Sequence, residues 1–136
     1  MIEKLAKLAD TDNDVLRAKL AQAIGNCCEW PGNRALFGQS GAVAPLVNYL
    51  ASNDIEVHRT TSSALFQLSK DPWNCVTMHQ HGVVGHLLRL IGKFLFLFRN
   101  HDFFKMMLAY QRKIEFLNAC KMSNLDFCTT LDVPLP

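Results

Sequence analysis

The apolar positions of this chain recur with a period of 41 residues. When residues 1–51 are compared with the residues 41 positions later without a gap, many apolar residues coincide, as do one proline and one glycine. A period of roughly 40–47 residues is typical of stacked helical repeats. The pattern therefore predicts an all-α chain that forms an α-α superhelix. The matches include Leu5 with Leu46, Ala23 with Ala64, Pro31 with Pro72, and Gly41 with Gly82.

Each repeat is predicted to contain three helices. Residues 43–50 and 84–91 place apolar side chains at i, i+3, i+4 and i+7, which is one face of a second helix. A longer third helix is predicted from Asp14 and again from Asp54–Ile55. Its apolar stripes are Leu16, Leu20, Ala23, Ile24 and Cys27, and then Val57, Thr61, Ala64, Leu65 and Leu68.

Turn-forming residues mark the helix ends. Asn33 and Asn74 are predicted to cap the short first helices, because their side chains can accept the free amides of a first turn. Gly41 and Gly82 are predicted to end these helices in turns with positive φ. The proline two residues before each asparagine is predicted to end the preceding third helix.

The period divides the chain into about two repeats plus a partial one. Residues 1–31 form a partial repeat, residues 32–72 a complete one, and residues 73–92 the start of the next. The residues predicted to be buried between the stacked helices are Leu20, Ile24, Leu46, Leu50, Leu65, Leu68 and Leu87.

The period is lost after Gly92. Glu115 and Ser123 stand where the repeat would place its asparagine and glycine, and seven of the nine phenylalanines lie after residue 92. We therefore interpret residues 93–136 as a divergent, phenylalanine-rich tail that is partly helical, near 103–118, and then disordered. An amphipathic docking segment is the alternative interpretation.

Composition narrows the classes of partner. The net charge is only +2 and no run of five like charges occurs, which argues against a nucleic acid or a membrane surface as partner. The longest apolar run, from Phe94 to Phe98, is far shorter than the roughly 18 residues of a membrane span. We interpret the five cysteines as reduced thiols of a cytosolic protein. They are Cys27, Cys28, Cys75, Cys120 and Cys128.

The sequence contains no convincing catalytic or metal site. Cys75, His79, His81 and His86 are the one cluster with metal-ligand chemistry, but their spacing matches no standard zinc site. We interpret the histidines as solvated surface residues. Neither a nucleophile with a base and an acid nor a phosphate-binding glycine loop is recognisable. We therefore predict no enzyme activity, no cofactor, no metal and no small-molecule substrate.

Six polar residues face away from the apolar stripes of the third helices. They form pairs one repeat apart, which suits a ladder of hydrogen bonds to the backbone of an extended peptide. An ordinary solvated helix face is the alternative. The predicted partner-binding residues are Lys19, Gln22, Asn26, Thr60, Ser63 and Gln67.

The segment from Asn33 to Gly41, followed by AVxPLVxxL at 42–50, resembles the armadillo repeat. The predicted third helix LRAKLAQAIGNCC shows the same alternation of small and large apolar residues. The resemblance covers residues 1–92. It implies a right-handed armadillo-type solenoid whose third helices line a concave groove, and a non-catalytic chain that binds other proteins.

Two kinds of armadillo protein are possible relatives. Residues 26–50 and 58–84 are similar to axonemal members of the family, which implies a scaffold that helps to dock outer dynein arms on ciliary microtubules. The implied partners are docking-complex subunits, axonemal dynein or microtubule-associated proteins, and the implied locations are the cytoplasm and the ciliary axoneme. The alternative is a soluble adaptor that binds a linear peptide in its concave groove. Such adaptors carry groove tryptophans, which Gln22 and Ser63 replace here.

Overall fold

The structure is a stack of helices. A computed structural model describes the backbone of residues 1–94 and the side chains of residues 1–90, and these residues form helices and turns without a β-strand. The all-helical order confirms the predicted armadillo-type solenoid. The helices are α1 (Ile2–Leu8), α2 (Asp14–Cys27), α3 (Pro31–Gln39), α4 (Val43–Tyr49), α5 (Ile55–Leu68), α6 (Pro72–Gln80) and α7 (Val83–Phe94).

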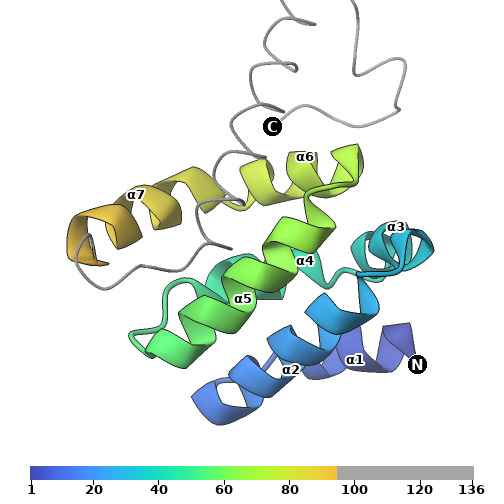
Figure 1. Ribbon diagram of the computed structural model, residues 1–136, viewed down its shortest axis with the longest axis horizontal. Coiled ribbons are helices and arrows are strands. Elements are labelled where there is room, and N and C mark those ends of the chain that lie inside the picture. The colour runs from blue at the N-terminus through green and yellow to red at the C-terminus, as the bar shows by residue number, and fades with distance from the viewer. Residues whose placement is uncertain (95–136) are drawn as a thin grey trace, which may run out of the picture.

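The helices follow the predicted order of the repeat. α3 and α6 are first helices, α1, α4 and α7 are second helices, and α2 and α5 are third helices. Figure 1 shows α2 and α5 lying side by side, with α3 and α6 next to their ends. The turns between first and second helices contain Gly41 and Gly82, whose φ angles are 79° and 76°. Both glycines therefore adopt the predicted left-handed conformation.

The two third helices approach each other closely. A Cβ atom added to Gly25 of α2 would lie 3.3 Å from the Cα atom of Ala64 on α5. Small residues at both positions therefore allow the two helix backbones to come near. All seven side chains predicted to be buried are buried, which confirms these positions as part of the core.

The two third helices differ in how much of their apolar stripe is covered. Leu16 of α2 is 42% exposed, whereas its counterpart Val57 on α5 is fully buried. Val57 lies on the side of α5 that also carries Ala64, and the close approach of Gly25 to Ala64 shows that this side faces α2. Among the described residues no third helix precedes α2, so the matching flank of α2 has no such cover.

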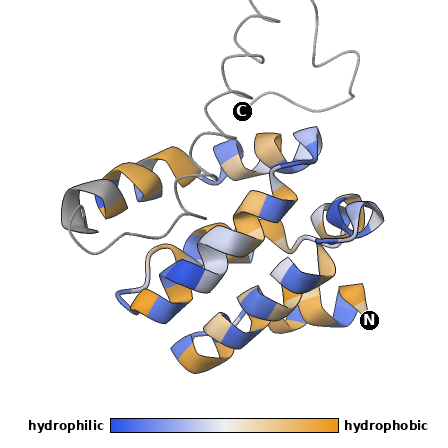
Figure 2. Cartoon of the chain, viewed as in Figure 1, coloured by the Kyte–Doolittle hydropathy of each residue, from blue (hydrophilic) through white to orange (hydrophobic). Residues whose placement is uncertain are grey.

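The last described helix, α7, buries only part of its apolar stripe. Val84 and Leu88 are 39% and 64% exposed, although their counterparts Val43 and Val47 are fully buried. Figure 2 shows that α7 is hydrophobic along most of its described length, whereas α2 and α5 mix hydrophobic and hydrophilic residues. Part of the apolar stripe of α7 therefore remains exposed. The buried side chains of α7 are Val83, Leu87 and Leu90.

Both first helices begin at a proline rather than at an asparagine. Each proline occupies the first turn of its helix, where the missing amide hydrogen costs little. The cap of α6 is Asp71, whose Oδ1 accepts hydrogen bonds from the amides of Trp73 and Asn74 at 3.0 and 3.2 Å. The predicted caps, Asn33 and Asn74, are therefore wrong. The prolines do not end the third helices either, because these end four residues earlier.

The two asparagines instead close the ends of the preceding third helices. The Nδ2 atom of Asn33 donates to the carbonyl of Cys27 at 2.8 Å, and that of Asn74 donates to the carbonyl of Leu68 at 3.1 Å. Asn74 also donates to the carbonyl of Arg34 at 2.9 Å, which joins α6 to α3. The repeated asparagine thus links neighbouring helices through side-chain hydrogen bonds.

Predictions for the divergent tail fall almost entirely outside the described residues. α7 continues to Phe94, two residues past the predicted boundary at Gly92. The local helix near 103–118 and the disorder after it stay predictions. None of the helices within residues 1–94 is both long and apolar enough to cross a membrane.

Candidate protein-interaction surface

The third-helix face, formed by the outward sides of α2 and α5, carries five of the six predicted partner-binding residues at its surface. Lys19, Gln22 and Asn26 are exposed on α2. Ser63 and Gln67 are half-buried on α5. The two members of a pair therefore differ in solvent exposure, because those on α2 are exposed and those on α5 are half-buried.

Thr60, the sixth predicted residue, does not belong to this surface. Its side chain is 3% exposed, and its hydroxyl donates to the carbonyls of Glu56 and Val57 at 2.9 and 3.3 Å. Threonine in a helix can bond back to the preceding turn in this way, which turns the side chain onto its own backbone. Including Thr60 in the predicted binding set was therefore wrong.

A shallow hollow lies between the N-terminal turns of α2 and α5. Its volume is about 130 Å³. It brings Lys19 and Gln22 of the predicted set together with three carboxylates outside that set, which stand in the caps or first turns of α2 and α5. The lining includes Asp14, Val15, Lys19, Gln22, Asp54 and Glu56.

Charged side chains of this hollow are partly paired within the chain. Arg59 Nε donates to Glu56 Oε2 at 3.0 Å. This hydrogen bond, followed by the charges of Arg59 and Lys19, lowers the pKa of the exposed Glu56 carboxyl against the opposing effect of desolvation. Asp54 accepts a hydrogen bond from the amide of Val57 at 3.0 Å and so caps α5. The hollow thus presents a mixed-charge surface that suits polar contacts with another protein.

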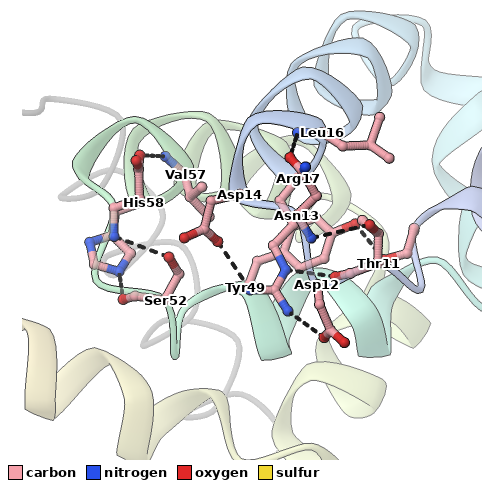
Figure 3. A network of polar contacts seen from close by, with 12 residues as sticks. Thr11, Asp12, Asn13, Asp14, Leu16, Arg17, Tyr49, Ser52, Val57 and His58 are labelled. Atoms are coloured by element: carbon pink, nitrogen blue, oxygen red, sulfur yellow. Dashed lines mark hydrogen bonds and ion pairs between the residues drawn. The ribbon is translucent and has the colours of Figure 1, made fainter.

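The start of α2 is held in place by Arg17, a residue that the sequence analysis did not select. Its guanidinium donates to the carbonyl of Thr11 at 2.7 Å and to the carboxylates of Asp14 and Asp12 at 3.0 and 3.2 Å (Figure 3). It also lies 5.5 Å from the ring centre of Tyr49. Arg17 therefore ties the turn before α2 to the second helix α4.

Tyr49 completes this network from the α4 side. Its buried hydroxyl donates to the carbonyl of Ala9 at the end of α1. Burial raises the pKa of Tyr49 to about 12, although the nearby charge of Arg17 acts in the opposite direction. The neutral phenol is thus favoured, as its donor role requires.

The next repeat uses a histidine at the same place. His58 is the residue 41 positions after Arg17, and its Nε2 atom contacts the carbonyl of Ser52, the counterpart of Thr11 (Figure 3). The caps also correspond, since Asn13 accepts the amide of Leu16 at 3.0 Å as Asp54 accepts that of Val57. The third helices are therefore positioned by equivalent contacts although the residue types differ.

The histidine and cysteine cluster does not gather around one point. Cys75 is buried and its thiol donates to the carbonyl of Ser69 at 3.1 Å. His79 and His81 are exposed, and His86 is half-buried with its pKa lowered by burial and then by Arg89. Within residues 1–90, no three histidine, cysteine, aspartate or glutamate side chains are grouped as metal ligands would be.

Raising the pH above 9 is expected to destabilise the fold through Cys28. Burial, and then the charge of Cys27, raises the pKa of the Cys28 thiol from 9.0 to about 12, against the effect of Arg34. Both states are protonated below pH 9, whereas between 9 and 12 only the unfolded thiol ionises, so stability falls as the pH rises. Urea unfolding at about pH 8 and about pH 10.5 checks this. Cys28→Ala should show a smaller loss between the two pH values than the parent.

The comparison with known proteins agrees with the repeat structure. No protein-family model matches the chain. The chain is 47% identical over 92 residues to the Armadillo repeat-containing protein gudu of Drosophila melanogaster. This similarity to an armadillo-repeat protein supports the armadillo-repeat assignment of the solenoid. The matched region is 68% of this chain but only 14% of the Drosophila protein, so this armadillo chain corresponds to a small part of its relative.

Proposed function

We propose that the chain is a non-catalytic protein-interaction scaffold, in an armadillo array that helps to dock outer dynein arms on ciliary axonemal microtubules. Armadillo-repeat proteins generally bind protein partners, and stacked helical repeats offer extended surfaces for doing so. The observation that carries the proposal is the third-helix face, where exposed polar side chains of α2 lie beside those of α5. The axonemal role rests on the similarity of residues 26–50 and 58–84 to axonemal members of the family.

The proposed partners are docking-complex subunits, axonemal dynein or microtubule-associated proteins, and the proposed locations are the cytoplasm and the ciliary axoneme. The polar character of the face suits specific, non-obligate contacts with such proteins. Lys19 and Gln22 are the α2 side chains best placed to make them, because they are exposed and border the hollow.

Proximity labelling from the full chain in ciliated cells is expected to enrich axonemal proteins. Lys19→Glu with Gln22→Glu should reduce this enrichment several-fold, because the added charges join the carboxylates already in the hollow. Lys4→Glu, an exposed change on α1, is the matched control and should leave the labelling unchanged. Enrichment of soluble cargo without axonemal neighbours would instead support the adaptor function and contradict the docking role.

A further inference from the structure

A second hollow lies between the first helices α3 and α6, away from the third-helix face. It encloses about 280 Å³, just below the roughly 300 Å³ at which sites for small-molecule ligands begin. That size suits one side chain of a partner rather than a cofactor. Its walls include Ala35 and Gln39 from α3 and Asp71, Trp73, Val76 and Thr77 from α6.

Among the described residues that line this hollow, Asp71 is the one that carries a charge. Both of its capping hydrogen bonds, from the amides of Trp73 and Asn74, go to Oδ1. Within residues 1–90 its other oxygen, Oδ2, accepts no hydrogen bond. The neighbouring cation, Lys70, donates to Gln67 Oε1 at 2.8 Å and lies 4.8 Å from the centre of the Phe66 ring. The ion pairs within residues 1–90 do not include Asp71.

Trp73 provides an aromatic wall beside this carboxylate. It is 39% exposed, so part of its indole remains open to a partner. A cation over an indole face is attracted by the ring, and a carboxylate oxygen accepts a charge-assisted hydrogen bond from the same group. A guanidinium satisfies both, because it is planar, stacks on aromatic rings and keeps its donors in a fixed fork.

The preceding repeat presents an indole at the equivalent place. Gly32 is the counterpart of Trp73, 41 positions earlier. A Cβ atom on Gly32 would lie 3.5 Å from Nε1 of Trp30, so the Trp30 indole occupies the space beside that position. Trp30 is 72% exposed. Large exposed aromatic side chains of this kind are frequent anchors of protein interfaces.

We propose that the edge formed by α3 and α6 is a second interaction surface, which binds a partner protein through an arginine side chain inserted between Trp73 and Asp71. The same partner segment continues along the edge and packs an apolar side chain on Trp30. This surface goes beyond the proposed function, because it is separate from the third-helix face and recognises a defined chemical group.

The chain itself offers the reporter for a test. Trp30 and Trp73 are its two tryptophans, so the full chain carrying Trp30→Phe reports on Trp73 alone. We expect the peptide acetyl-Ala-Gly-Arg-Gly-Ala-amide to change the emission of Trp73 in a saturable manner. The same peptide with citrulline in place of arginine keeps the shape and loses the charge, and should give no saturable change.

Asp71→Asn separates charge from fold. Asparagine caps a helix as well as aspartate does, so circular dichroism and thermal unfolding should match the parent. Loss of the charge-assisted bond should weaken arginine-peptide binding about tenfold. Equal responses to the arginine and citrulline peptides, equally tight binding of a lysine peptide, or unchanged affinity in Asp71→Asn would each overturn the proposal. The titration is independent of axonemal labelling, so either proposal can fail alone.

Discussion

Replacing Leu65 by alanine is expected to lower the free energy of unfolding by about 2–5 kcal/mol. Leu65 lies within α5, the helix that packs against both α2 and α4, and its side chain is fully buried. The truncation removes apolar contacts and leaves a cavity that the close approach of α2 and α5 prevents from collapsing fully. Urea unfolding of the full chain, followed by circular dichroism at 222 nm, a wavelength at which helices absorb, measures the loss.

The matched control is the same truncation at an exposed position. Leu88 on α7 is 64% exposed, so Leu88→Ala should change the free energy of unfolding by about 0.5 kcal/mol or less. The contrast between the two variants tests the packing itself, because the chemical change is identical. A Leu65→Ala protein as stable as Leu88→Ala would mean that α5 is not the centre of the core.

The period of the sequence was enough to predict the helices and most of the core. Apolar spacing identified α2 and α5 and their buried side chains, since helical periodicity depends mainly on which residues avoid water. Gly41 and Gly82 were predictable because a positive φ strongly favours glycine. These features are local or repeated, and one sequence reveals both.

The helix caps were not predictable from the period alone. Asparagine is a good cap, but each first helix already begins at the proline two residues before the asparagine. Asn33 and Asn74 then serve a tertiary role, closing the ends of α2 and α5. Whether such an asparagine caps its own helix or bonds to a neighbouring one depends on where the neighbouring helix ends.

The candidate surfaces were only partly predictable, for a similar reason. The repeat offset placed Thr60 opposite Lys19, but spacing does not show that a threonine hydroxyl turns back to its own helix. Asp54 was predicted at a helix start, yet its position beside Lys19, like that of Glu56, depends on how α2 meets α5. The hollow beside Trp73 likewise exists only because α6 packs on α3.

Gly38→Ala is expected to lower the free energy of unfolding by about 2–4 kcal/mol, because the new methyl group displaces Asn74. A Cβ atom at position 38 would lie 1.9 Å from Oδ1 of Asn74, well inside van der Waals contact. The Asn74 side chain is 2% exposed and donates to the carbonyls of Arg34 and Leu68. Moving this side chain breaks the hydrogen bonds that link α6 to α3 and to the end of α5.

A double-mutant cycle in urea tests this cause directly. Asn74→Ala alone should also destabilise the chain, since it leaves the carbonyls of Leu68 and Arg34 without that donor. Once the asparagine is gone, however, the methyl group of Gly38→Ala has room, so adding it should cost little. The two changes should therefore be non-additive by about 1–3 kcal/mol. If Gly38→Ala lowers the free energy of unfolding as much in the Asn74→Ala background as in the parent, its effect comes from helix α3 alone. The proposed displacement of the Asn74 link would then be wrong.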